Sequence, residues 1–321
     1  MRIIDPMRRA LELAEVWQGR CAPNPAVGAV VVRDGKIIAE GAHQGPGLPH
    51  AEVMALNHVE STDADELYVT LEPCCHQGRT PPCTDLIIDR GIKRVFFAYL
   101  DPNPEVAGRG QRRLIDAGID CQQAPMAAVD LFYQPYKHWW HHKMPTVTLK
   151  LAITDAHSFA IDPLTGPECQ RYTHQQRLQH DALLTTATTI AHDNPQMNGR
   201  LVDNTIKKPL YILDSTLRTP KTARVFDTCD PVTLLQASND LELKQCLKRI
   251  AEDGYHTLWI ESGWKSASAF IRAGLVDKLI FYVASAQVNT NTQPFDFVYE
   301  LGGPRDISID RLGEDLLIQL E

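Results

Sequence analysis

Short apolar segments alternate with helix-like segments along the first 120 residues, and this alternation limits the fold more than any other feature of the sequence. The expected strands cover residues 25–32, 36–43, 66–73 and 93–100, and the expected helices cover residues 50–59, 81–91 and 108–120. The first two strands are joined by "RDGK", which is a β-hairpin signal. Strands that alternate with helices predict a layered α/β domain.

A second group of apolar segments begins at residues 144–153, "MPTVTLKLAI", after the aromatic and histidine-rich residues 132–143. Further strands are expected at residues 208–214, 256–262 and 277–285. The chain has 321 residues, about twice the usual length of one domain. We therefore expect two α/β domains, residues 1–145 and 146–321.

Composition and charge exclude several classes of protein. The formal net charge of −8 argues against a broad nucleic-acid-binding surface. The longest apolar runs, such as "AVGAVVV", are far too short to span a bilayer, and the N-terminal residues lack the continuous apolar region of a secretory signal. Eight cysteines without regular spacing are typical of a reducing compartment, so we expect a cytoplasmic protein without nucleic-acid or membrane partners.

Cysteine, histidine and glutamate occur together in a pattern that predicts a metal site. "LPHAEVMAL" contains His50 and Glu52, and "LEPCCHQGRTPPC" contains Cys74 and Cys83. Zinc binds imidazole nitrogen and thiolate sulfur, and a catalytic zinc site keeps one position for water. The H-x-E and P-C pattern is that of zinc nucleobase deaminases, in which the glutamate transfers protons. The alternative is a closed structural zinc site with a fourth ligand from Cys75 or His76.

These motifs resemble those of a known family. Eight residues separate Cys74 from Cys83, and this spacing, with "PNPAVGAVVV" and "GAHQGPGLPHAE", resembles the deaminase half of the bifunctional riboflavin-biosynthesis deaminase/reductase. The resemblance covers about the first 145 residues and implies a cytidine-deaminase-like three-layer fold. It implies removal of the ring amino group of 2,5-diamino-6-ribosylamino-pyrimidinone 5′-phosphate. It also implies that the pyrimidine sugar phosphate is bound by Asn24, His43, His76 and Arg79.

The second half resembles the reductase domain of the same family, which has a dihydrofolate-reductase-like fold and uses NADPH to reduce the ribosyl group to ribityl. The segments "TVTLKLAIT", "HQQRLQHDALLTTATTIAHDNPQMNGR" and "LYILDSTLRTPKTARVF" carry this resemblance. It implies substrate binding by Arg177, Met197, Arg200 and Glu261, and cofactor binding by Thr189, Asp193, Ser215 and Gly263.

The second half also departs from the family pattern. Ile161 and Pro163 stand where the family has a serine and a tryptophan, and the usual "EGG" is "ESG", with Ser262 followed by Gly263 and the bulky Trp264. Three functions therefore stay open: a bifunctional enzyme, a deaminase with a degenerate reductase-like domain that serves as a scaffold or dimerisation module, and a nucleic-acid deaminase. A homo-oligomer is compatible with each of them.

Overall fold

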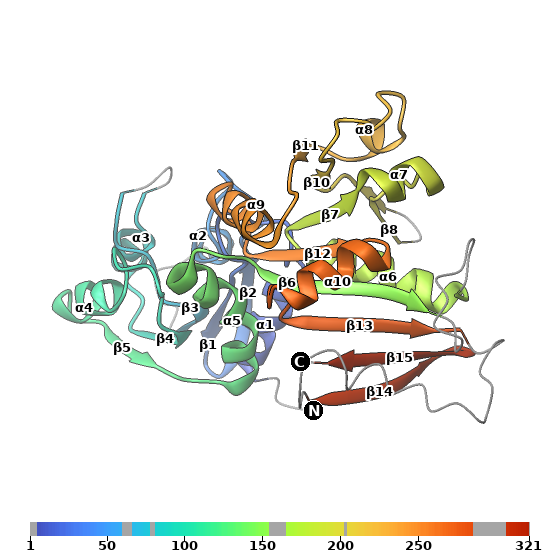
Figure 1. Ribbon diagram of the computed structural model, residues 1–321. Helices are drawn as coiled ribbons and strands as arrows, with labels where there is room; N and C mark the ends of the chain where they lie inside the picture. The colour runs from blue at the N-terminus through green and yellow to red at the C-terminus, as the bar shows by residue number, and fades with distance from the viewer. Residues whose placement is uncertain are drawn as a thin grey trace. The chain divides into compact units, whose positions relative to one another are not determined.

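The computed structural model describes residues 5–59, 66–77, 81–153, 165–201, 204–284 and 306–320 (Figure 1). The chain divides into two compact units, Met1–Lys143 and Met144–Glu321. No helix in the described part of the chain has the length and apolar character needed to cross a membrane.

Unit 1 contains a five-stranded sheet with the strand order β2-β1-β3-β4-β5. Its strands are β1 (Gly28–Arg33), β2 (Lys36–Ala42), β3 (Glu66–Leu71), β4 (Arg94–Tyr99) and β5 (Asp120–Gln123). β1 is antiparallel to β2 and β3, whereas β3, β4 and β5 are parallel. The predicted hairpin is confirmed, because Asp34 and Gly35 join β1 to β2 with φ of 51° and 70°, as a tight two-residue turn requires.

Helices cover both faces of this sheet. α1 (Pro6–Glu15) and α5 (Ala127–His142) pack on one face, and α2 (Ala51–Leu56), α3 (Cys83–Asp89) and α4 (Arg109–Asp116) pack on the other. Side chains alternate along a strand, so Ala29 and Val31 contribute to the α2 face while Val30 and Val32 pack towards α1. The predicted three-layer domain is confirmed.

The sequence analysis did not assign α5, which begins before the aromatic and histidine-rich residues and contains Pro135 in its interior. A proline there removes one helical hydrogen bond and usually ends or kinks a helix. Tertiary packing holds this helix instead. The buried Tyr133 hydroxyl lies 2.7 Å from the hydroxyl of Thr70 and donates to the carbonyl of Ala26 at 2.9 Å.

Unit 2 is built on an eight-stranded sheet with the order β11-β10-β7-β12-β6-β13-β15-β14. Its strands are β6 (Thr146–Ile153), β7 (Ala182–Thr186), β10 (Leu210–Leu213), β11 (Val232–Leu235), β12 (Thr257–Glu261), β13 (Lys278–Val283), β14 (Ile307–Leu312) and β15 (Asp315–Leu320). The pairings from β11 to β13 are parallel, and β15 is antiparallel to β13 and β14. A separate two-stranded sheet contains β8 (Gly199–Leu201) and β9 (Asn204–Ile206).

The two faces of the large sheet are covered by different helices. α9 (Asp240–Glu252) and α10 (Trp264–Arg272) pack on one face, and α6 (Pro167–Gln179), α7 (Ala187–Asp193) and α8 (Val225–Thr228) pack on the other. Along β6, Val147 and Leu149 join the α9–α10 core. Lys150 is on the opposite face, where it approaches Glu261 of β12. This face therefore carries buried charges next to α6.

Candidate active sites

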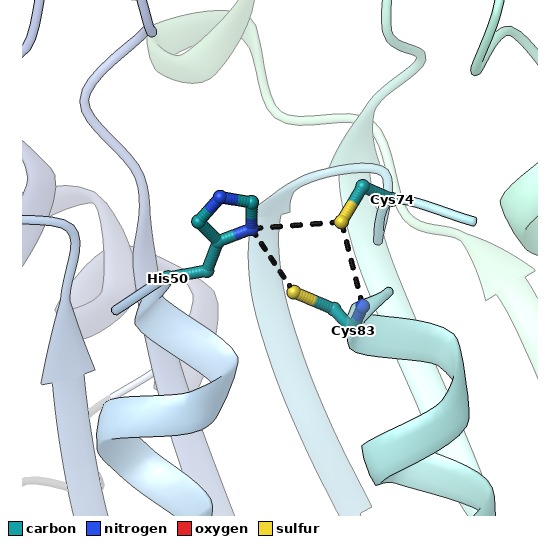
Figure 2. A group of neighbouring side chains, drawn as sticks. All are labelled: His50, Cys74 and Cys83. Atoms are coloured by element: carbon teal, nitrogen blue, oxygen red, sulfur yellow. Dashed lines mark hydrogen bonds between the residues drawn. The ribbon is translucent and has the colours of Figure 1, made fainter. Parts of the chain in front are cut away.

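Three segments of unit 1 bring the predicted metal ligands together (Figure 2). His50 is the residue that precedes α2, Cys74 lies in the loop after β3, and Cys83 is the first residue of α3. His50 Nδ1 is 3.2 Å from the sulfur of Cys83 and 3.5 Å from that of Cys74. The backbone N–H of Cys83 also donates to the Cys74 sulfur at 3.4 Å, which holds the loop against the start of α3.

The ligand atoms fit a zinc ion. Tetrahedral zinc, with nitrogen at about 2.1 Å and sulfur at about 2.3 Å, requires nitrogen–sulfur separations of about 3.6 Å. The two separations observed around His50 Nδ1 lie near this value, and all three ligand atoms are within 4.8 Å of one another. Among the described residues this cluster has only three members, and neither Cys75 nor His76 belongs to it. The geometry thus favours a catalytic zinc site over a closed structural one.

The thiols have unlike environments before a metal binds. Hydrogen bonding with Cys83 lowers the pKa of Cys74 to about 4, while the same contact and burial raise the pKa of Cys83. The cluster therefore favours the thiolate form of Cys74, and zinc would also stabilise the thiolate of Cys83.

Glu52 lies in the first turn of α2, two residues after His50. Its side chain is 4% exposed and lines the same cavity as His50 and Cys74. Burial, together with the negative charge of Cys74, raises the pKa of Glu52 to about 7. A carboxyl group in this position can take up and release a proton beside the ligands.

A cavity of about 330 Å³ extends from the ligands and includes the predicted substrate residues Asn24, His43 and His76. His43 Nδ1 donates to the carbonyl of Pro49 at 3.1 Å, so its Nε2 accepts from the side-chain amide of Asn24 at 3.2 Å. Burial lowers the pKa of His43, which favours this neutral form. The Nδ1 atom of His76 is buried without a hydrogen-bond partner. Arg79 lies outside the described residues.

The sequence analysis missed a polar group in the wall of this cavity. Asp101, Asn103 and Tyr136 line it, and Asp101 accepts from the backbone N–H of Asn103 at 2.9 Å and from the Tyr136 hydroxyl at 3.4 Å. Burial raises the pKa of Asp101 to about 6. The sequence did contain a signal for this group. The segment "DPNP" follows β4, and the loop with Cys74 follows β3. Because β3 and β4 are parallel neighbours, both segments lie at the same edge of the sheet.

In unit 2, three of the predicted cofactor residues follow neighbouring parallel strands. Thr189 is in α7 just after β7, Ser215 follows β10, and Gly263 follows β12. β10, β7 and β12 are adjacent and parallel, so their carboxyl ends lie at one edge of the sheet, where open α/β sheets bind ligands. Asp193, the last residue of α7, is exposed.

The altered "ESG" segment at this edge can accept a phosphate. Gly263 precedes α10, and a Cβ atom added to it would meet nothing within 4 Å. The hydroxyl of Ser262 is buried without a partner, so a donor is available next to the first turn of the helix. Trp264 is partly buried against the core that contains residues of α9 and α10. These features fit an NADPH phosphate. The divergent Ile161 and Pro163 lie outside the described residues.

Two predicted substrate residues of unit 2 pair with each other. Arg177 of α6 makes a two-point contact with Glu261 at the end of β12, through Nε to Oε1 at 2.6 Å and Nη2 to Oε2 at 3.0 Å. The Nε1 atom of Trp259 also donates to Oε1 at 2.8 Å, and Lys150 Nζ is 3.9 Å from Oε2. Although burial raises the pKa of Glu261, Arg177 and Lys150 lower it to about 2. Sequence analysis had not identified Lys150 as part of this group.

The other two substrate residues predicted for unit 2 lie on the segment that follows α7. Met197 is 1% exposed and has φ of 49°, which is rare for a residue other than glycine. Arg200 is the exposed middle residue of β8, and its Nη1 atom donates to the side-chain oxygens of Asn198, at 2.6 Å, and of Gln196.

Comparison with known proteins relates both halves of the chain to one group of enzymes. Residues 3–99 match the cytidine and deoxycytidylate deaminase zinc-binding region, and residues 145–294 match the RibD C-terminal domain. The riboflavin biosynthesis protein RibD of Aquifex aeolicus is 35% identical over 347 aligned positions, which cover 97% of this chain and 96% of the relative.

Two similar solved structures cover 98% of this chain and 97% of their own length. RibD of Acinetobacter baumannii, form 1, has a TM-score of 0.85 and 30% identity. The diaminohydroxyphosphoribosylaminopyrimidine deaminase/5-amino-6-(5-phosphoribosylamino)uracil reductase of Thermotoga maritima has a TM-score of 0.83 and 31% identity.

The folds and the two sites define a zinc-binding deaminase unit joined to a reductase unit. The similarity extends over nearly the whole chain, including both halves. The chain belongs to the RibD family of bifunctional deaminase/reductase enzymes of riboflavin biosynthesis, and the predicted fold and family are confirmed.

Proposed function

We propose that unit 1 hydrolytically deaminates 2,5-diamino-6-ribosylamino-pyrimidinone 5′-phosphate and that unit 2 reduces the ribosyl group of the product to ribityl with NADPH. The observation that carries the proposal is the three-ligand cluster of His50, Cys74 and Cys83, with the buried Glu52 beside it in the same cavity. The choice of substrate is supported by the activity named for the Thermotoga maritima relative.

His50, Cys74 and Cys83 would hold the zinc ion. When bound, zinc acts as a Lewis acid that makes water nucleophilic at neutral pH. Glu52 moves one proton of the attacking water to the adjacent ring nitrogen and the other to the amino group, which leaves as ammonia while the ring carbon becomes a carbonyl. The buried position of Glu52 keeps its carboxyl group directed at the ligands and away from bulk solvent.

The remaining cavity residues orient the substrate. Asn24 and His43 form one hydrogen-bonded unit, so the Asn24 carbonyl oxygen is fixed as an acceptor. The unpartnered Nδ1 of His76 and the carboxyl group of Asp101 offer further contacts to ring or ribose groups. Arg79 is our candidate for the phosphate, because a guanidinium makes strong charge-assisted hydrogen bonds to phosphate oxygens.

Thr189, Ser215 and Gly263 would hold NADPH at the carboxyl edge of β7, β10 and β12. When bound, NADPH supplies a hydride to the sugar carbon. Arg200 is exposed and has neutral side-chain partners, so it is available to pair with the substrate phosphate. Asp193 completes the proposed cofactor residues.

Two assays on the purified chain test the two half-reactions separately. Ammonia release from the diaminopyrimidine substrate measures deamination, and loss of NADPH absorbance with the deaminated intermediate measures reduction. We expect both. Ammonia release without NADPH oxidation, and without calorimetric binding at millimolar NADPH, would favour the deaminase with a degenerate second unit.

The partners and location follow from charge and thiol chemistry. We propose a cytoplasmic enzyme that binds no nucleic acid, supported by the net charge of −8 and by eight free cysteines. A homo-oligomer is compatible with this function, and sedimentation would distinguish it from a monomer.

A further inference from the structure

We propose that His138 and His142, in the last turns of α5, form a second metal site that binds a divalent transition-metal ion through two imidazole groups. Neither histidine belongs to the His50 cluster or lines the cavity that extends from it. The pair thus gives a chemical role to the histidine-rich stretch, which the proposed function does not use.

The spacing of the two rings suits a shared ion. Residues four apart in a helix lie on the same face, and helical metal sites use two histidines at this spacing. The ring centroids of His138 and His142 are 4.7 Å apart, and the ring planes are inclined by 40°. An ion that binds a ring nitrogen at about 2.1 Å lies about 3.2 Å from the ring centroid, so two rings on one ion, with ligand angles of about 90° to 109°, have centroids about 4.6 to 5.3 Å apart. The observed separation falls in this range, near its octahedral end.

The helix that carries the pair is fixed by its other face. Tyr133 and Tyr136 are buried in the core of unit 1, and the ring of Trp139 stacks on that of Tyr136. His138 follows Tyr136 by two residues, about 200° around the helix, so it lies on the side away from this core. His138 is half-buried and His142 is exposed. Because packing holds the backbone between the two rings, little order has to be gained when a metal binds.

Charges near the end of α5 are compatible with a bound cation. The last carbonyl groups of a helix carry a partial negative charge, equivalent to about half an elementary charge. The ammonium group of Lys143 lies over the rings of Trp139 and Trp140, 5.2 and 4.2 Å from their centroids, and the electron-rich ring faces partly offset its charge. Lys137 is exposed, so its ammonium group can extend into solvent.

The ligand set determines which metals the site takes. Among the described residues, no third histidine, cysteine, aspartate or glutamate completes the pair, and His141 in the same turn does not join it within 4.8 Å. Two imidazoles suit nickel, copper and zinc, whereas magnesium and calcium prefer oxygen ligands. The remaining positions stay open to water, so binding should be reversible and weaker than at the three-ligand cluster.

Calorimetric titration of the zinc-loaded full chain with Ni²⁺ tests the site. Zinc fills the His50 cluster first, and metal analysis after the titration checks that it stays there and that each variant is folded. Wild type should bind about one Ni²⁺ per chain and no Mg²⁺ at this site. His138→Ala and His142→Ala should each weaken nickel binding about tenfold or more, because the second imidazole no longer acts at high effective concentration.

The matched control is His141→Ala, an exposed histidine of the same turn outside the pair, which should bind nickel as wild type does. Absence of nickel binding in the wild-type chain, or equal binding in wild type and both pair variants, would overturn the proposal.

Amide hydrogen exchange in α5 shows where the nickel binds. An ion that bridges two turns opposes local opening of the helix, so Ni²⁺ should slow exchange of residues 138–143 about threefold or more in wild type and leave it unchanged in His142→Ala. Nickel bound elsewhere on the chain would not change this exchange. Identical exchange of wild type with and without saturating Ni²⁺ would therefore overturn the proposal even if calorimetry detects binding.

Discussion

Substitution of Gly110 by alanine should disrupt the zinc site although Gly110 is not a ligand. Gly110 lies in α4, where the helix approaches the loop that carries Cys74. A Cβ atom at this position would be 2.0 Å from the carbonyl oxygen of Pro73, the residue before Cys74, and 3.2 Å from Glu72 Oε1. The Glu72 carboxylate accepts hydrogen bonds from the backbone N–H groups of Gly108 and Gln111 at 2.9 and 3.1 Å, so it is held against the start of α4.

The required movement can be compared with the tolerance of the metal site. Real Cβ atoms essentially never approach closer than 3.0 Å, so the helix and loop must separate by about 1 Å. Zinc–ligand distances in a working site stay within about 0.2 Å of their ordinary values. Displacement of Pro73 by several times that amount moves Cys74, and perturbing the supporting residues of a metal site typically costs about 10- to 100-fold in metal affinity.

The assay is a chelator competition on the full chain, with denaturant unfolding of the zinc-free protein in parallel. Gly110→Ala should lower zinc affinity at least tenfold and lower stability. Helix propensity alone predicts that this substitution raises stability, since replacing glycine by alanine inside a helix stabilises it by about 1 kcal/mol. Ile115→Ala, an exposed change in the same helix, is the control and should retain zinc. Wild-type zinc affinity together with raised stability in Gly110→Ala would refute the argument.

Three further predictions concern the two sites. Metal analysis should find about one zinc ion per wild-type chain. Cys83→Ser should lose both the zinc and the deaminase activity, while NADPH binding measured by calorimetry persists. Full zinc occupancy in this variant would show that Cys83 is not a ligand. Glu52→Gln should keep its zinc yet release ammonia about 10²- to 10⁴-fold more slowly, and wild-type turnover would contradict the proposed proton transfer. The pKa of Glu261 is lower in the folded chain than its value near 4.5 in the unfolded chain, so ionised Glu261 stabilises unit 2 by about 3 kcal/mol at any pH above 4.5. This contribution should be lost as the pH falls from 4.5 towards 2. Denaturant titrations followed by tryptophan fluorescence should therefore show a steeper acid destabilisation in wild type than in Glu261→Gln, and equal slopes would count against the ion pair.

The zinc site could be predicted because its information is local and chemical. His50 and Glu52 are fixed relative to each other by the first turn of α2, and the residue types at Cys74 and Cys83 have few other uses in a motif of this spacing. The β-hairpin was predictable for a similar reason, since the backbone of Asp34 and Gly35 requires turn residues.

The features that sequence reasoning missed depend on contacts between distant segments. Arg177 and Glu261 are separated by 84 positions, so no local pattern shows that they pair with each other. Asp101 enters the deaminase cavity only because β3 and β4 are parallel neighbours. Pro135 argues against a helix locally, and the packing of Tyr133 and Tyr136 overrides it.

The order of strands in the two sheets has a consequence for biosynthesis. In the described part of unit 1 every strand, and each of the three proposed zinc ligands, precedes residue 124, and the unit ends at Lys143, before β6 begins. In unit 2 the first strand, β6, is central and pairs with β12 and β13, which are made more than 100 residues later. During synthesis both edges of β6 therefore stay unpaired until β12 and β13 have been made, and strand pairings between residues this far apart in the sequence form slowly. Expression of the chain should therefore be limited by the second unit, and the first should capture zinc while the ribosome is still translating.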